Sequence, residues 1–233
     1  MMNSNDPSET EYRHQLVIGI SLLERVGIID FNGHFSIRLS DGNILINTGA
    51  SVRSKLDITD FVIVGPDGEF SEEDLRPPAE LPLHIAIYQS RPDVMSIVHG
   101  HPRWSTLLTS TGNKYQVTMP QGALLGDVPT YPSPMSVTNS RIAGAIAKKL
   151  DCGRAALLKA HGSVVTGIDV LETTVLAIYL ELNAERQVRA SMLGTPYIFS
   201  TEETQSLQKG LAKRGLYEKC WNYYLAKYKL ETN

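Results

Sequence analysis

The sequence predicts an α/β protein whose central sheet is mixed or antiparallel. Segments with the patterns of short strands are mingled with helical segments over the first two thirds of the chain, and the two kinds do not alternate strictly. Neither a Gly-x-Gly-x-x-Gly fingerprint nor a Walker phosphate-binding loop is present, which disfavours a Rossmann fold. Because no linker, repeat or charge block divides the chain, we expect one domain over residues 1–233, with a helical extension from about residue 200.

The N-terminal part of the chain predicts a helix followed by a hairpin. Hydrophobic residues recur at helical spacing from Glu11 to Val26, and Gly27 ends the pattern. From Phe35 to Leu39, hydrophobic and polar residues alternate instead, as in a strand with one buried face. Asp41-Gly42 then predicts a tight turn into a second strand at Ile44 to Ile46.

The next segment predicts a strand, a helix and another strand. Phe61 to Val64 is a short apolar run that ends at the turn sequence Pro66-Asp67-Gly68. Leu81 to Gln89 predicts a helix, in which Pro82 is tolerated because the first turn does not need its N–H. Asp93 to His99 is then expected to be a strand.

The remaining elements are predicted from the same patterns. They are a helix at 103–111, an extended piece at Tyr131, a helix at 136–150, strands at 155–159 and 163–166, and helices at 171–192 and 202–228. Near the C-terminus, Trp221, Tyr223 and Tyr224 are expected to pack in a core or an interface, and a lid over a pocket is the alternative.

Composition and charge indicate a soluble protein that acts on small molecules. The 233 residues are 42% hydrophobic and 20% charged, and a formal net charge of −3 without any basic run argues against nucleic-acid binding. Residues 1–10 are polar and acidic, and no apolar stretch approaches the ~18 residues of a membrane span. We therefore expect a cytoplasmic protein with no membrane partner. The cysteines, Cys152 and Cys220, are expected to be buried free thiols.

Three of the six histidines lie where a metal ion would need them. His99-Gly100-His101 ends a predicted strand, so both imidazoles face one side of the sheet and Gly100 keeps the other side clear. The pair alone is a weak signal, since a surface or hydrogen-bonded pair has the same spacing. His161, which precedes a glycine at the end of another apolar strand, raises the count to three. Catalytic zinc, manganese or iron sites typically use three protein ligands and leave a position open.

Glu80 is the candidate for proton chemistry. It begins the helix that precedes the His99 strand, which brings it near the histidine pair. The alternative is a first-turn glutamate that stabilises the helix through its dipole. His84, one turn further along, is expected to pack or to support the site from outside the ligand set. His14 is expected to face solvent.

Together these motifs resemble those of the class II aldolase/adducin family. The similarity runs from about Leu16 to Leu193. It rests on His99-Gly100-His101-Pro102, on His161-Gly162 followed by Val164-Val165-Thr166-Gly167, and on Glu80 before Leu83-His84-Ile85-Ala86-Ile87-Tyr88 and Arg91-Pro92-Asp93-Val94. The resemblance implies a three-layer α/β/α fold around a mainly antiparallel sheet.

The resemblance also implies a metal-dependent site. A divalent ion would be held by His99, His101 and His161, with Zn²⁺ or Mn²⁺ favoured and Fe²⁺ or Co²⁺ as further options. Glu80 would act as an acid/base residue that can also bind the metal. Family members are commonly homotetramers with active sites at subunit interfaces, so we expect a homo-oligomer.

Two departures from the family pattern bear on the substrate. Members that act on sugar phosphates carry Gly-Asn in the first loop and Ser-Ser before the catalytic acid, which supply amide and hydroxyl donors to phosphate. Here the loop reads Asn32-Gly33-His34, and Pro78-Ala79 precedes Glu80. Proline has no N–H and alanine has no hydroxyl, so these bonds to phosphate are lost. At about 1.5–3 kcal/mol per hydrogen bond to a charged group, the loss disfavours a phosphosugar substrate.

Gly33-His34, the Pro-Pro-x-Glu run and Glu181-Leu182-Asn183-Ala184-Glu185-Arg186-Gln187 are similar to the decarboxylase branch of the family. That branch acts on hydroxylated aromatic or pyridine dicarboxylates and on carboxy-muconic semialdehydes. The resemblance therefore implies a lyase that decarboxylates a small hydroxy-aromatic or enolisable carboxylate, in which the metal stabilises the enolate-like charge that develops.

The candidate substrate-binding residues lie in two loops. Gly33 and His34 belong to the first, and Thr48-Gly49 to the second. Arg53 is expected either to pair with a substrate carboxylate or to be a solvated loop residue. His34 has a similar alternative, a hydrogen-bonded loop histidine.

Two other functions remain open at this point. The first is aldol cleavage of a non-phosphorylated hydroxy-acid or sugar, for which the metal site would be the same. The second is a non-catalytic interaction module like the adducin head domain. A scaffold has no physical need for a complete ligand set, so the presence of all three histidines and Glu80 disfavours the second.

Overall fold

The computed structural model describes residues 7–70 and 75–230, and most of the acidic N-terminal segment lies outside the described residues. The helices are α1 (Glu9–Arg25), α2 (Leu81–Ser90), α3 (Arg103–Ser110), α4 (Ser140–Leu150), α5 (Val170–Leu193), α6 (Thr201–Leu211) and α7 (Arg214–Tyr228). The strands are β1 (His34–Arg38), β2 (Ile44–Asn47), β3 (Phe61–Val64), β4 (Ser96–Gly100), β5 (Thr130–Tyr131), β6 (Ala155–Leu158) and β7 (Gly162–Gly167). Two short 3₁₀ helices, η1 (Arg53–Lys55) and η2 (Pro120–Leu125), complete the set.

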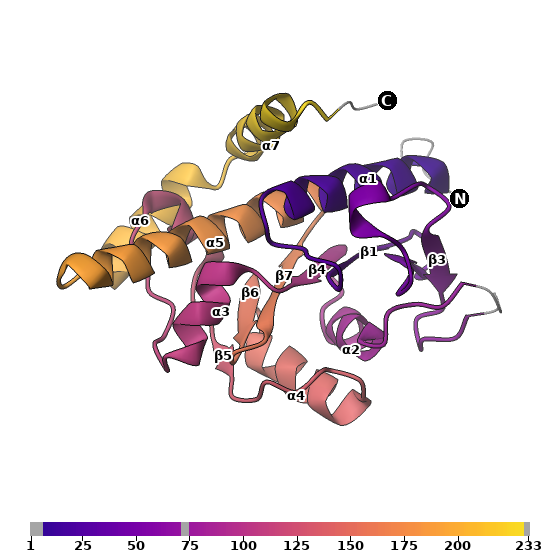
Figure 1. Cartoon of the computed structure of the whole chain (residues 1–233), viewed down its shortest axis with the longest axis horizontal. Helices are drawn as coiled ribbons and strands as arrows, with labels where there is room; N and C mark the ends of the chain where they lie inside the picture. Colours follow the sequence, from indigo (N-terminus) through magenta and orange to yellow (C-terminus); the bar gives the residue numbers. More distant parts are fainter. Residues whose placement is uncertain (1–6, 71–74, 231–233) are drawn as a thin grey trace.

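The described strands form one sheet in the order β3-β2-β1-β4-β7-β6-β5. Neighbouring strands are antiparallel except β5 and β6, which are parallel. Helices cover both faces: α2 and α4 lie on one, and α1, α3 and α5 on the other (Figure 1). The predicted three-layer fold with a mainly antiparallel sheet is confirmed.

Alternating side chains of each strand supply two hydrophobic cores. Phe35 and Ile37 of β1 point into the larger core beneath α1 and α5. His34 and Ser36 of the same strand face the α2 side instead, where their side chains contact His84 of α2. The period of the strand thus directs two polar residues toward the α2 layer.

Three predicted boundaries are corrected by the structure. The helix expected from residue 136 begins at Ser140, because the Asn139 side chain accepts the N–H of Ile142 and caps it there. The strand expected from residue 93 begins at Ser96. The helix expected over 202–228 is two helices, and glycines at 210 and 215 flank the break, where they weaken helical structure.

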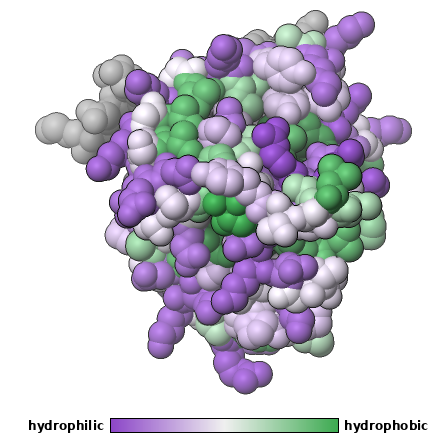
Figure 2. All heavy atoms as spheres, turned by 90° about the vertical axis from the view of Figure 1, so that its left-hand side faces the viewer, coloured by the Kyte–Doolittle hydropathy of each residue, from purple (hydrophilic) through white to green (hydrophobic). Residues whose placement is uncertain are grey.

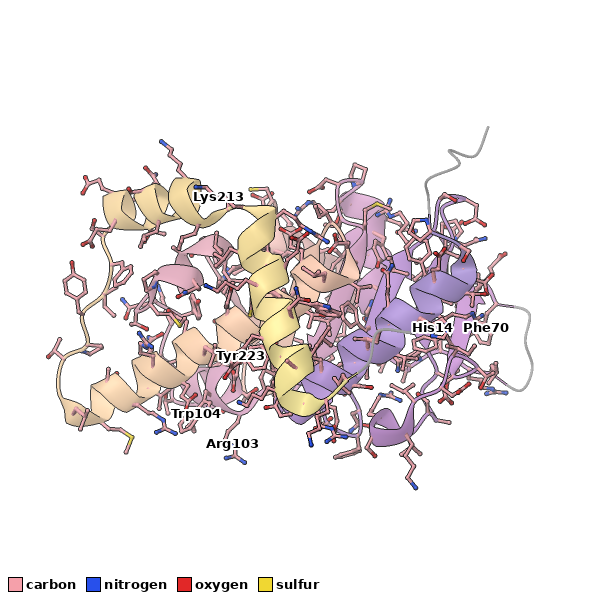
Figure 3. The ribbon with its side chains drawn as sticks, turned by 90° about the horizontal axis from the view of Figure 1, so that it is seen from above. His14, Phe70, Arg103, Trp104, Lys213 and Tyr223 are labelled. Carbon is pink, nitrogen blue, oxygen red and sulfur yellow. The ribbon has the colours of Figure 1, made fainter. Side chains whose placement is uncertain are left out.

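The C-terminal helix α7 packs on the outside of the α1/α5 layer. Figure 3 shows α7 crossing over α5 and α1, on the face of the sheet opposite α2. Trp221 is buried in the larger core, as the packing interpretation expects, whereas Tyr223 is mostly exposed.

Among the described residues, no helix is both long and apolar enough to cross a membrane. The expectation of two buried thiols is wrong, because Cys152 is exposed just beyond α4 and Cys220 is half-buried.

Glycines allow the strand ends at the histidine motifs to pack against backbone. A Cβ at Gly100 would lie inside van der Waals contact with the carbonyl oxygen of Ile28, and one at Gly162 would do the same with Gly100. Gly100 therefore does more than clear one side of the sheet. It lets the loop after α1 lie directly against β4.

Replacing Gly100 by alanine is expected to destabilise the fold by about 2 kcal/mol or more, because backbone cannot move aside as a flexible side chain can. Urea unfolding of the metal-free protein measures this. Gly144→Ala is the matched control: nothing lies within 4 Å of its Cβ position in α4, so that change should be neutral or stabilising by about 0.5–1 kcal/mol. Equal stabilities for the two variants would contradict the close approach.

Candidate metal centre

Three elements bring four predicted residues together at one end of the sheet. β4 and β7 are antiparallel neighbours with Gly100 opposite Ser163, so the end of β4 meets the start of β7. His99 and His101 therefore lie beside His161. Glu80 reaches them from the N-terminal end of α2. One candidate ligand atom from each of the four residues lies within 4.8 Å of the other three.

The Glu80 carboxylate lies among the imidazoles. Its Oε2 is 3.4 Å from Nε2 of His99 and 3.4 Å from Nε2 of His34, and its Oε1 is 3.7 Å from Nε2 of His161. Oε1 also accepts the backbone N–H of Val137 at 2.7 Å. Burial raises the pKa of Glu80, but the hydrogen bond from His34 and the nearby ring of His99 outweigh burial and hold the pKa well below the usual range. Glu80 is therefore ionised at neutral pH.

The ring of His99 fits a metal ligand better than any other role. It is fully buried, and neither ring nitrogen has a hydrogen-bond partner among the described residues. A buried nitrogen without a partner is costly unless its lone pair binds something. Three imidazoles and a carboxylate are a donor set that zinc, manganese, iron and cobalt all accept. The residues present therefore fit a divalent metal ion, although they do not select one.

Asp30 orients one of the candidate ligands. Its two carboxylate oxygens lie 3.1 and 3.2 Å from Nδ1 of His101. A proton on Nδ1 leaves the Nε2 lone pair of His101 for the cluster, which is how carboxylates commonly support metal-binding histidines. The sequence does not indicate Asp30, because it lies 71 residues from His101 and no spacing pattern links the two.

Asp30→Asn is expected to lower metal affinity about 10- to 100-fold, because the amide keeps the size of the side chain but loses the charge that supports His101. Competition with a chelator of known affinity measures the change. Asp41→Asn, in the exposed turn between β1 and β2, is the matched control and should bind metal normally. Equal affinity in Asp30→Asn and the wild type would show that Asp30 does not support a ligand.

The predicted substrate loops lie side by side next to this cluster. His34 is 1% exposed, and its ring centroid is 4.9 Å from that of His99. Thr48 and Gly49 follow β2, and a Cβ at Gly49 would lie 3.4 Å from the carbonyl oxygen of Pro77. The backbone N–H groups of Thr48 and Gly49 are already bonded, to Asp60 and Arg76 respectively.

Arg53 joins the two loops. Its side chain is 3% exposed and donates hydrogen bonds to the carbonyl oxygens of Gly33, Thr48 and Ser51. The interpretation as a solvated loop residue is therefore wrong. Nε and Nη1 are occupied, so any bond to a substrate carboxylate must come from Nη2. No ion pair to Arg53 is present among the described residues, so its charge has no direct counter-ion.

His84 lies behind His34, on the side away from Glu80. Its Nε2 is 2.7 Å from Nδ1 of His34, and its Nδ1 is 2.6 Å from the hydroxyl of Ser36. Burial lowers the pKa of His34 to about 4 and lowers that of His84 well below its ordinary value. Both rings are therefore neutral at pH 7.

The metal-free protein is expected to lose stability as the pH falls from about 6.5 toward 4. Unfolded His34 takes up a proton near pH 6.5, whereas the folded residue resists protonation until about pH 4, so acid favours the unfolded chain. His34 alone should lower the free energy of unfolding by about 3 kcal/mol when the pH reaches 4. Urea unfolding over this pH range measures how steeply the free energy of unfolding changes with pH. His84→Gln removes the second buried ring and should make this dependence shallower. A flat profile would contradict the burial of neutral histidines.

The chain matches one family model over most of its length. A model described as the class II aldolase and adducin N-terminal domain matches residues 18–188. This range contains Glu80, the three clustered histidines and both substrate loops.

Curated relatives of known activity include two decarboxylases. The 3-oxo-tetronate 4-phosphate decarboxylase of Escherichia coli K12 is 32% identical over 146 residues, covering 60% of this chain and 68% of that protein. The 3,4-dihydroxyphthalate decarboxylase of Terrabacter sp. DBF63 is 29% identical over 177 residues, covering 70% and 74%. Among solved structures, L-fuculose 1-phosphate aldolase from Glaciozyma antarctica PI12 superimposes with a TM-score of 0.82 at 20% identity, over 97% of this chain and 93% of that one. At that identity the likeness concerns the fold alone.

Proposed function

Because this chain belongs to the class II aldolase and adducin family, we propose that it is a metal-dependent carbon–carbon lyase that decarboxylates a small hydroxy-aromatic or otherwise enolisable carboxylate. The observation that carries the proposal is the cluster of Glu80 with three histidines, one of which is fully buried and has no hydrogen-bond partner among the described residues. Decarboxylases of two kinds stand among its relatives, beside aldolases, and they support this choice over aldol cleavage.

Each residue of the site has a role in this reaction. His99, His101 and His161 would hold the divalent ion, with Glu80 as a further ligand or as the proton-transfer group. The ion, when bound, supplies a positive charge that stabilises the negative charge developing on the substrate. Zn²⁺ or Mn²⁺ is favoured, with Fe²⁺ and Co²⁺ as further options.

Glu80 is suited to move one proton. Since it is ionised at neutral pH, it first accepts a proton from the substrate hydroxyl. Glu80 then delivers this proton to the carbon that carries the carboxylate. The bond from that carbon to the carboxylate breaks, carbon dioxide leaves, and the electron pair restores the ring or the enolate, so the cycle needs no other acid. His34, Thr48, Gly49 and Arg53 would hold the substrate during these steps.

The loops favour a substrate without phosphate. The N–H groups of Thr48 and Gly49 are bonded to backbone carbonyls, and Pro77 and Pro78, which lie against this loop, have none. An oxyanion with three acceptor oxygens would find few amide donors here. The Escherichia coli relative is named for a phosphorylated substrate, so the loops are where we expect this chain to differ from it.

A substrate panel tests the proposal. Protein loaded with Mn²⁺ or Zn²⁺ is incubated with hydroxy-aromatic dicarboxylates, with 3-oxo-tetronate 4-phosphate and with non-phosphorylated hydroxy-keto acids. We expect release of carbon dioxide from the first group. Pyruvate from the hydroxy-keto acids without carbon dioxide from the others would favour an aldolase. Protein that takes up no metal and turns over none of these compounds would favour a non-catalytic interaction module.

We also propose that the protein is cytoplasmic and forms a homo-oligomer, with a tetramer expected. Large hydrophobic side chains are exposed at the end of α5 and just beyond it, at Met192, Leu193 and Tyr197. Figure 2 shows this end of the molecule, where hydrophobic groups are interspersed among hydrophilic ones. Light scattering on the purified protein measures the assembly, and a monomer at micromolar concentration would contradict it.

A further inference from the structure

A chain of four contacts leads from Glu80 into the layer between β1 and α2. Nε2 of His34 lies 3.4 Å from Glu80, and Nδ1 of His34 lies 2.7 Å from Nε2 of His84. Nδ1 of His84 lies 2.6 Å from the Ser36 hydroxyl, which lies 2.8 Å from the Tyr88 hydroxyl. Beyond Glu80, every member is at most 5% exposed. The chain is therefore shielded from water.

Two regular spacings build this chain. Glu80, His84 and Tyr88 are four residues apart, which places them on one face of α2. His34 and Ser36 are two residues apart, which places them on one face of β1. The polar side chains on this face of α2 lie opposite those on this face of β1. Residues of the helix and of the strand therefore alternate along the chain of contacts. The sequence contains both spacings, but only the structure pairs them.

When each imidazole carries one proton, the contacts allow one direction for the hydrogen bonds. Two ring nitrogens 2.7 Å apart need one donor and one acceptor. The Glu80 carboxylate only accepts, so His34 presents Nε2–H to it, and the neutral ring leaves Nδ1 as an acceptor. His84 then donates from Nε2 and accepts from Ser36 at Nδ1. The single proton of Ser36 then goes to His84, so Ser36 accepts from the Tyr88 hydroxyl, whose 2.8 Å contact with Ser36 is shorter than its 3.5 Å contact with the carbonyl oxygen of Met95. In this arrangement every donor points toward Glu80.

We propose that His84, held by Ser36 and Tyr88, is a positioning residue that fixes His34 in the Nε2–H tautomer. His34 thereby offers one N–H donor to an anionic oxygen of the substrate beside Glu80. The opposite tautomer would present a lone pair to the carboxylate and repel that substrate oxygen. The substrate half of this inference rests on the proposed function, whereas the tautomer can be observed without any substrate.

Nitrogen NMR of the metal-free protein with ¹⁵N-labelled histidine rings tests the tautomer directly. In the wild type we expect His34 and His84 to be protonated at Nε2 and unprotonated at Nδ1. His34 protonated at Nδ1, or at both nitrogens, would overturn the proposal. His14→Gln identifies one of the other histidine signals and should leave those of His34 unchanged, because His14 lies on α1 (Figure 3).

Two replacements of His84 separate positioning from packing. The amide nitrogen of glutamine can take the place of Nε2 and still donate to His34, whereas the shorter asparagine amide cannot reach it. We expect His84→Gln to keep the His34 tautomer, and His84→Asn to give a mixture of the two. Turnover in His84→Asn should fall about 10- to 100-fold at nearly unchanged KM, and His84→Gln should restore most of it. A pure Nε2–H tautomer in His84→Asn would overturn the role of His84.

Tyr88→Phe keeps the inference testable if both His84 variants fail to fold. It removes one hydroxyl and retains the ring, which packs in the core on the α2 side of the sheet and against Arg38. We expect a partial shift of the His34 tautomer, and no shift would count against the chain. A protein with the expected tautomer that decarboxylates nothing in the substrate panel would overturn the proposed function alone.

Discussion

Glu80→Gln is expected to lower turnover about 10²- to 10⁴-fold while the three histidines still bind metal, because glutamine can neither accept nor return the proton. The amide is close in size to the carboxylate and can keep the hydrogen bond from Val137, so the start of α2 should not move. Metal content and steady-state decarboxylation are measured on the same preparation. A parallel loss of metal and activity would assign Glu80 to metal binding alone.

Glu202→Gln is the matched control for this variant. Glu202 is an exposed residue in the first turn of α6, and its carboxylate is not part of the cluster. Its replacement should leave turnover and metal content unchanged. More than a tenth of wild-type turnover in Glu80→Gln would mean that another group carries the proton.

The elements of the fold follow from local patterns in the sequence. The alternation in β1, the turn at Asp41-Gly42 and the helical spacing in α1 are each visible within a few residues, and each is present in the structure. The errors occur at element ends and at the break between α6 and α7, and at the start of α4 one capping side chain decides. Asn139 sets the start of α4 in this way, and no hydrophobic pattern reveals it.

The candidate metal cluster was predictable because its members lie at element ends that the sequence marks. His99 and His101 end a strand, His161 precedes one, and Glu80 begins a helix. The sequence did not reveal the residues that hold these side chains in place. Asp30 contacts His101 across 71 residues, and Ser36 contacts His84 across 48, so these pairs exist only once β1, β4 and α2 have packed together.

Arg53 illustrates a different limit. The sequence indicates a cation in a loop but not whether its donors are free. In the structure, backbone carbonyls from both substrate loops surround the guanidinium and occupy Nε and Nη1. Arg53 thus holds the loops together first, and only Nη2 remains for a substrate. A residue type alone cannot distinguish these roles, because both need a positive, planar donor group.

His99→Ala is expected to abolish metal binding and with it all turnover above background. His99 is the fully buried member of the cluster, and its ring nitrogens make no hydrogen bond among the described residues, although Nε2 lies 3.4 Å from the Glu80 carboxylate. We therefore expect these nitrogens to contribute chiefly through the metal that they bind. In the wild type, metal at 100 times its Kd should stabilise the folded state by about 2.7 kcal/mol. The variant should show no such increase in Tm when the same metal is added.

His14→Ala separates this effect from the loss of any histidine, since His14 lies on α1 outside the cluster. It should keep both the metal content and the metal-dependent rise in Tm. A comparison of metal-free His99→Ala with the metal-free wild type is equally informative. Because the His99 ring is buried without a hydrogen-bond partner among the described residues, the metal-free wild type already carries its desolvation cost. Alanine removes that cost while it leaves a cavity. The two effects oppose each other, so metal-free His99→Ala should remain folded, and unchanged metal content in that folded variant would contradict the ligand assignment.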